Sequence, residues 1–190
     1  MPLVRRDPPR PPETTGVSAV APSPRDLDCR TGAADDLGNA LEAEKDLRAR
    51  EALLAALLAI ADPSAAAALA QHLRSEDAWL RNASIEALQA MPAAAASVLP
   101  NLLTDADPDV RLLATEIMRT QPTEIANGML VSLLEHETHP NVCGAAVEVL
   151  AEVGTADAVP ALRAARTRFA SEAFLPLAID TVLARLGSGR

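Results

Sequence analysis

A block of five residues recurs about every thirty-one positions along this chain, and it limits the possible folds more than any other feature. Its five copies begin at Asp46, Asp77, Asp107, His139 and Glu172, which lie 31, 30, 32 and 33 residues apart. In the first three copies an arginine closes the block, four residues after the acid. A repeat of this length is typical of a helical hairpin that cannot bury its own apolar face. The sequence therefore predicts a stack of hairpins that share one continuous core.

Apolar residues follow each block in a constant register. The residue eleven positions after the start of each block is apolar in every copy: Leu57, Leu88, Met118, Leu150 and Leu183. The residue three positions later is apolar in all copies but one: Ile60, Met91, Gln121, Val153 and Leu186. Positions three apart lie on one face of a helix. We expect these side chains to form a buried ridge, in which Gln121 is the one misfit.

Aspartate and proline mark the starts of the expected helices. Asp62-Pro63 and Asp107-Pro108 each place a capping acid before a proline, which a first helical turn tolerates. We expect first helices at residues 38–60, 77–91, 107–120, 139–153 and 172–186, and second helices at 64–74, 93–104, 123–136 and 157–168. The predicted fold is all-α, a right-handed α-solenoid of about four and a half hairpins.

Residues 1–36 differ in composition from the rest. They hold seven of the fifteen prolines and few apolar residues. Such a segment cannot offset its chain entropy by burial, so we expect a disordered tail at residues 1–36 and the solenoid at residues 37–190. Pro8-Pro9-Arg10-Pro11-Pro12 is either a docking peptide for a proline-recognition domain or a solvated leader.

The composition favours a helical, acidic protein. Tyrosine is absent, aromatic residues make up 2%, and the hydrophobic 49% is mostly Ala and Leu, which favour helices over strands. Acids outnumber Lys and Arg by 26 to 17, and the formal charge is -9. Because phosphate binding depends on clustered Lys and Arg, we expect no nucleic-acid partner.

The expected location is the cytoplasm. No stretch approaches the eighteen or so uninterrupted apolar residues of a membrane span, and the first residues lack the apolar core of a signal peptide. We therefore expect no membrane partner. Cys29 and Cys143 are too few for a disulfide framework, so we expect free thiols. Sixteen Arg against one Lys indicates GC-rich coding DNA, which points to a bacterium.

The repeated features resemble HEAT repeats of the bacterial type, also described as PBS-lyase-like HEAT repeats. The resemblance covers about residues 38–186, and two stretches carry it best: Asp107-Pro108-Asp109-Val110-Arg111 with Ala114-Thr115-Glu116-Ile117-Met118, and Ala146-Val147-Glu148-Val149-Leu150-Ala151-Glu152-Val153-Gly154 running into Ala158-Val159-Pro160-Ala161-Leu162. It implies an α-solenoid that serves as a scaffold, an adaptor or, in some members, an enzyme.

The resemblance also implies a polar ladder between successive hairpins. It would be formed by the acid and the arginine of the block, which are Asp46, Arg50, Asp77, Arg81, Asp107 and Arg111. The spacing alone offers a second account, in which each Asp caps a helix and pairs with the Arg four residues later in that helix. Cys143 and Pro176 replace the arginine in the last two copies, so we expect a weaker ladder there.

One cluster has the residue types of a metal site: His136, His139 and Cys143. Pro140 interrupts the helix that would align them, so we expect His139 to be a helix cap and Cys143 a buried apolar residue. Deoxyhypusine hydroxylases bind iron through several His-Glu pairs, whereas this chain has one, His136-Glu137. HEAT-like DNA glycosylases have a basic groove, and this chain is acidic. We expect no catalytic residue, cofactor or metal.

The expected function is that of a non-enzymatic adaptor that holds a protein partner with basic patches. Its binding surface, by resemblance, is the concave side lined by the second helices, with Gln71, His72, Arg74, Asn101, Thr104, Asn127, Ser132, Glu135, Arg163 and Arg166. Trp79 and Phe174 share one slot of the block that should face outward, where an aromatic anchors a partner or covers a turn or a stack end. The alternative is a chromophore lyase or enzyme-associated subunit like the phycobiliprotein lyases.

Overall fold

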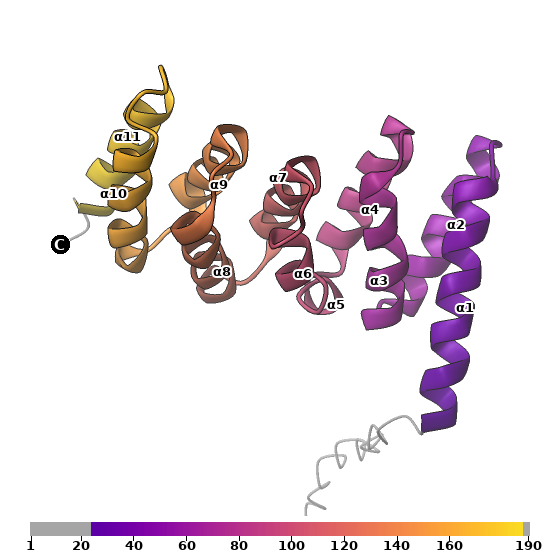
Figure 1. Ribbon diagram of the computed structural model, residues 1–190. Helices are drawn as coiled ribbons and strands as arrows, with labels where there is room; N and C mark the ends of the chain where they lie inside the picture. The colour runs from indigo at the N-terminus through magenta and orange to yellow at the C-terminus, as the bar shows by residue number, and fades with distance from the viewer. Residues whose placement is uncertain (1–23, 188–190) are drawn as a thin grey trace, which may run out of the picture.

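The structure, a computed structural model, describes residues 24–187, with side chains from residue 31 onward (Figure 1). All regular structure in this part of the chain is helical. The α-helices are α1 (Pro24–Ala43), α2 (Leu47–Ile60), α3 (Pro63–Gln71), α4 (Ala78–Ala90), α5 (Pro92–Ala95), α6 (Leu99–Leu103), α7 (Pro108–Ile117), α8 (Thr123–His136), α9 (Pro140–Val153), α10 (Val159–Arg168) and α11 (Leu175–Gly187). Short 3-10 turns extend α3 and α7 and precede α10: η1 (His72–Arg74), η2 (Met118–Thr120) and η3 (Ala156–Ala158).

The helices form two rows along an elongated stack (Figure 1). The first helices α2, α4, α7, α9 and α11 pack on one another in chain order. The second helices make the other row, in which α1 packs on α3, α3 on α5, and α8 on α10. Each helix contacts mainly its chain neighbours and the next member of its row, as a solenoid requires. The predicted all-α solenoid is confirmed.

The predicted helix at residues 38–60 is wrong, because α1 ends at Ala43 and α2 begins at Leu47. The Glu44 carboxylate accepts the backbone N–H groups of Lys45 and Asp46, at 2.7 and 2.8 Å. Asp46 in turn caps α2 by accepting the N–H of Ala49 at 3.0 Å. These side-chain bonds replace helical ones and turn the chain without proline or glycine.

The predicted tail boundary at residue 36 is also corrected, because α1 starts at Pro24 and belongs to the stack. Ala34 and Leu41 of α1 are fully buried, and α1 packs along α3. Gly38 permits this close packing, since a Cβ atom there would lie 3.1 Å from the Cβ of Ala68. The prolines of residues 1–23 lie outside the described residues.

The predicted second helix at residues 93–104 is interrupted, and it consists of α5 and α6 with a turn between them. Pro100 explains the interruption: it has no N–H to donate to Ala96, and its ring clashes with the carbonyl of that residue in a continuous helix. The other predicted helices agree with α3, α4, α7, α8, α9, α10 and α11 to within about three residues.

The core follows the predicted ridge. Leu57, Leu88, Met118 and Leu150 are fully buried. Gln121 is also buried, and its Nε2 donates to the carbonyl of Pro92 at 3.1 Å, so a hydrogen bond to the preceding repeat replaces an apolar contact. None of the helices between residues 24 and 187 has both the length and the hydropathy that a bilayer span needs.

Candidate protein-binding groove

The acids of the first three blocks cap the helices that follow them. A carboxylate oxygen of Asp46 accepts the N–H of Ala49 at 3.0 Å, that of Asp77 accepts the N–H of Trp79 at 3.0 Å, and that of Asp107 accepts the N–H of Asp109 at 2.9 Å. Each bond satisfies a donor that an α-helix leaves free at its N-terminus. The block acid therefore fixes where each first helix starts.

The block arginines reach back to the loop before their own helix. Arg50, Arg81 and Arg111 each donate to the backbone oxygen six residues earlier, at 2.7, 2.6 and 2.7 Å. The acceptors are the oxygens of Glu44, Ser75 and Asp105. Each guanidinium therefore ties a first helix to the chain that leads into it.

Two of these arginines also form ion pairs with the next hairpin. Arg50 Nη1 lies 2.9 Å from Asp77 Oδ2, and Arg111 binds both carboxylate oxygens of Glu137 at 2.8 Å. Among the described ion pairs, none joins Arg81 to Asp107 or an Asp to the Arg four residues later in its block. The predicted ladder is therefore formed at one rung, Arg50–Asp77, while Arg111 pairs with Glu137 instead of a block acid. Of the second account, the capping by each Asp is observed and the pairing with the Arg four residues later is not.

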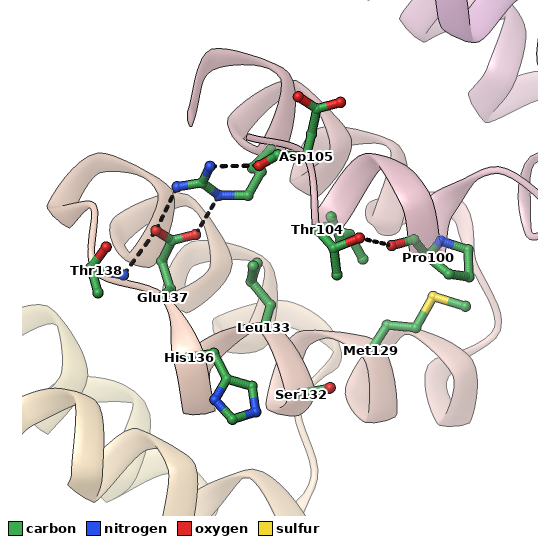
Figure 2. A pocket seen from close by; sticks show the side chains of 11 residues that line it. Pro100, Thr104, Asp105, Met129, Ser132, Leu133, His136, Glu137 and Thr138 are labelled. Atoms are coloured by element: carbon green, nitrogen blue, oxygen red, sulfur yellow. Dashed lines mark hydrogen bonds and ion pairs between the residues drawn. The ribbon is translucent and has the colours of Figure 1, made fainter. Parts of the chain in front are cut away.

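A groove opens between the second helices α6 and α8, beside the Arg111–Glu137 pair (Figure 2). Its volume is about 480 Å³. It is lined by Pro100, Leu103, Thr104, Asp105, Arg111, Met129, Ser132, Leu133, His136, Glu137 and Thr138. Apolar groups of both helices form the floor, and hydroxyl, imidazole and ionic groups surround it.

The groove exists because α6 is short. The interruption before Pro100 leaves one and a half turns of helix, and α6 packs mainly on α7 rather than along α8. Leu103 and Leu133 are buried at the base, while Met129 is half-buried. A methionine thioether is flexible and polarisable, so this wall can adapt to different apolar side chains.

The charged groups at one end of the groove, Arg111 and Glu137, are bound to each other and to the backbone. The Glu137 side chain is 2% exposed, and its carboxylate also accepts the N–H of Thr138 and of His139, at 2.9 and 2.8 Å. Burial is the largest influence on Glu137 and opposes its charge, but the bonds from Arg111 and the backbone together outweigh burial. The pKa of Glu137 is therefore lowered. The hydrogen bonds that Arg111 donates to Glu137 raise the pKa of Arg111.

The groove lies within a stretch that carries a known repeat pattern. The family model that describes HEAT repeats matches residues 95–172, from the end of α5 to the loop after α10. Residues 95–172 therefore form HEAT repeats. The helices outside this stretch continue the same two rows (Figure 1).

The crystal structure of an engineered protein from the Northeast Structural Genomics Consortium is similar with a TM-score of 0.44 and 21% sequence identity. That similarity covers 87% of this chain and 83% of the engineered one. No curated protein matches the sequence.

Several of the polar residues predicted on the second HEAT helices lie at or near the groove. Thr104 and Ser132 line it, and Asn101 and Glu135 are exposed on α6 and α8. Arg74 forms an ion pair with Asp105, which lines the groove. Gln71, Arg163 and Arg166 are exposed elsewhere on this row, and Arg166 is paired with Asp180 of α11.

Two of the predicted surface residues are buried, which corrects the prediction. His72 is 4% exposed because α1, most of which was predicted as part of the disordered tail, covers α3. Burial is the main cause that lowers the pKa of His72. Asn127 is also buried, and its Oδ1 accepts the N–H of Thr155 at 3.0 Å. Both side chains are used inside the helical stack.

Trp79 and Phe174 occupy the same slot of the repeated block but have different surroundings. Trp79 is half-buried, and the guanidinium carbon of Arg50 lies 4.9 Å from the ring centroid. Trp79 therefore faces outward only in part and covers the guanidinium of Arg50. Phe174 faces outward and is 83% exposed.

The three residues with side chains typical of metal ligands do not form one group. His136 is exposed in the groove, His139 is half-buried at the start of α9, and Cys143 is fully buried. Burial raises the pKa of the Cys143 thiol to about 12. Residues 31–187 contain no group of three or more His, Cys, Asp or Glu side chains placed to hold an ion.

Neither the apolar floor of the groove nor the place of Glu137 at its edge was predicted from the sequence. The floor depends on the break in the second helix, for which Pro100 is the signal. Glu137 has a signal as well: it stands two residues before the start of its block, where the first three copies have Glu44, Ser75 and Asp105. All four accept the N–H of the block's first residue.

Proposed function

We propose that this HEAT-repeat chain is a non-enzymatic adaptor that binds a protein partner in the groove between α6 and α8. The observation that carries the proposal is the groove itself. It is concave, mostly apolar and edged by a few polar groups, which is typical of sites that receive a side chain or a short segment of another molecule.

The polar groups around the groove support binding rather than chemistry. Arg111 and Glu137 bind each other through two bonds of 2.8 Å. Thr104 donates its hydroxyl to the carbonyl of Pro100 at 2.9 Å. Groups held in this way shape a surface and are not poised to attack a substrate. Ser132 and His136 remain exposed and can hydrogen-bond a partner.

The charge of the solenoid favours a partner with a basic surface. Residues 31–187 contain 22 acids and 11 Lys and Arg. Complementary charge mainly raises the rate of association and makes that rate depend on salt. We expect the partner to associate faster at low ionic strength.

A substitution at the groove tests the proposal. Ser132 is exposed on α8, so Ser132→Arg places a bulky group in the groove without burying a charge in the core. Ser171→Arg is the matched control, since Ser171 is exposed in the loop between α10 and α11 and is not among the residues that line the groove. Proteins retained from a lysate of the source organism are identified for the wild type and both variants. The affinity of each purified candidate is then measured by calorimetry.

We expect a partner that binds the wild type and Ser171→Arg equally and binds Ser132→Arg about tenfold more weakly or worse, a loss of about 1.4 kcal/mol. Equal affinity for all three proteins would place the contact elsewhere and contradict the proposed groove. A chromophore band in the absorption spectrum of the purified chain would contradict the non-enzymatic assignment.

A further inference from the structure

A second groove runs across the other row of helices, the first helices, where α7, α9 and the start of α11 meet. Its volume is about 520 Å³. It is lined by Leu112, Glu116, Pro140, Asn141, Gly144, Ala145, Glu148, Glu172, Ala173, Phe174, Leu175 and Ala178. None of these residues lines the groove between α6 and α8.

Exposed apolar side chains stand at the α11 end of this first-helix groove. Phe174 is 83% exposed, and Leu177, one turn later, is 68% exposed. Leu177 lies five residues after the start of its block. On α7, Leu112 occupies the corresponding position and is half-buried. An exposed aromatic beside an apolar groove is a common anchor of protein interfaces.

Gly144 keeps the groove open. It lies inside α9, where glycine costs about 1 kcal/mol relative to alanine. A Cβ atom at Gly144 would meet nothing within 4 Å, so no close approach of neighbouring atoms requires glycine there. The absent side chain instead leaves room between Ala145 and the first residues of α11.

The side walls of the first-helix groove are acidic. Glu116, Glu148 and Glu172 line it, and the Glu148 side chain is 73% exposed. Arg119 pairs with Glu116 at 2.9 Å and lies 3.8 Å from Glu148, and it also pairs with Glu152. One guanidinium thus serves three carboxylates, and the groove keeps a negative charge that a cationic group of a partner would complement.

We propose that the first-helix groove docks a segment of a partner protein that presents an apolar side chain flanked by Lys or Arg. The apolar side chain lies over Gly144 and Ala145 against Phe174, and the cationic groups face Glu148 and Glu172. This surface is separate from the groove between α6 and α8, so the chain can hold two proteins at once. The proposal for the first-helix groove does not depend on binding in the groove between α6 and α8.

The test uses full-length protein and a fluorescein-labelled synthetic peptide that repeats the unit Arg-Leu-Leu-Arg, with binding followed by anisotropy. Gly144→Leu fills the groove, changes no charge and replaces glycine by a better helix former. Gly128→Leu is the control, because Gly128 is also a mid-helix glycine with open space around it, on α8 of the other row, where it is exposed while Gly144 is half-buried. We expect Gly144→Leu to weaken binding about tenfold or more and Gly128→Leu to leave it unchanged.

A charge variant tests how much the acidic walls, apart from the apolar floor, contribute to peptide binding. Glu148→Lys should also weaken peptide binding about tenfold, and its control Glu135→Lys, exposed on α8, should weaken it much less. A peptide with Glu in place of Arg should not bind. Thermal melts followed by circular dichroism check that each variant is folded. If Gly144→Leu does not fold, the charge variants still test the proposal.

Three outcomes would overturn the proposal. Unchanged binding to Gly144→Leu and to Glu148→Lys would show general attraction to an acidic surface. A dimer of the wild type that Gly144→Leu dissociates, seen by light scattering, would make a second copy the occupant. Tighter peptide binding by the double variant Arg5→Glu, Arg6→Glu would make the chain's own N-terminal segment the occupant.

Discussion

Arg168 at the end of α10 donates a hydrogen bond of 2.9 Å to the backbone oxygen of Glu137. This oxygen lies six residues before Cys143, and the block arginine reaches the corresponding oxygen in each of the first three repeats. Arg168 also donates to the oxygens of Leu134 and Glu135, both at 2.8 Å. An arginine from α10, the second helix of the hairpin that contains Cys143, therefore takes the place of the one that Cys143 replaces.

Loss of the Arg168 contacts should destabilise the C-terminal repeats. We expect Arg168→Met to lower the free energy of unfolding by about 1–2 kcal/mol, because the end of α8 loses the donors for its free carbonyl groups. The further change Cys143→Arg restores an arginine at the block position, and we expect it to recover at least part of the loss. Urea unfolding of the three proteins measures this. A double variant less stable than Arg168→Met would show that Cys143 and Arg168 are not exchangeable.

The buried pair of Arg111 and Glu137 should make a large contribution that depends on pH. Glu137→Gln leaves Arg111 without its charged partner, and we expect a loss of about 3 kcal/mol at neutral pH. The folded-state pKa of Glu137 is lowered, so its stabilising effect is present above the ordinary pKa of the carboxyl and disappears as pH falls through the folded value.

Chemical unfolding at a series of pH values checks the Glu137 prediction. The stability difference between wild type and Glu137→Gln should be largest near neutral pH and should shrink in acid. The double variant Arg111→Met, Glu137→Gln should be more stable than Glu137→Gln alone, because it removes the unpaired guanidinium. A difference that does not change with pH would contradict the role given to the Glu137 charge.

Protonation of His72 should loosen the packing of α1 on α3. Burial, the largest influence, outweighs the neighbouring Glu42 and lowers the folded-state pKa of His72, whose Nε2 has no hydrogen-bond partner. For a histidine with a lowered pKa, the unfolded chain takes up the proton first, so stability is constant above about pH 6.5 and falls as pH drops below it. His72→Gln should lose less stability than wild type between pH 7 and pH 5, measured by thermal melts. Parallel curves for the two proteins would exclude this role.

The end of α2 should become more stable when Ala61 is changed to glycine. Ala61 has φ 48°, the one non-glycine residue between 24 and 187 with positive φ, and its N–H donates to Leu57 at 3.1 Å. A left-handed conformation costs an L-residue about 1 kcal/mol, which glycine avoids. We expect Ala61→Gly to raise the free energy of unfolding by about 0.5–1 kcal/mol. A lower melting temperature would show that the greater freedom of glycine in the unfolded chain outweighs the relief.

The sequence alone determined the features that are local and periodic. The blocks at Asp46, Asp77 and Asp107 marked helix starts because an aspartate accepts N–H groups only two or three residues away. The ridge from Leu57 to Leu150 could be predicted because a helix brings every third or fourth residue to one face. Repetition of both signals at one period is sufficient for an all-α stack.

The tertiary structure alone decided which side chains meet across hairpins. His72 is buried because α1 covers α3, and Arg168 reaches Glu137 from a helix thirty-one residues away. The groove between α6 and α8 depends on how far one short helix stands from its neighbour. Such contacts depend on distances in space between separate helices, and a repeat period in the sequence carries no information about those distances.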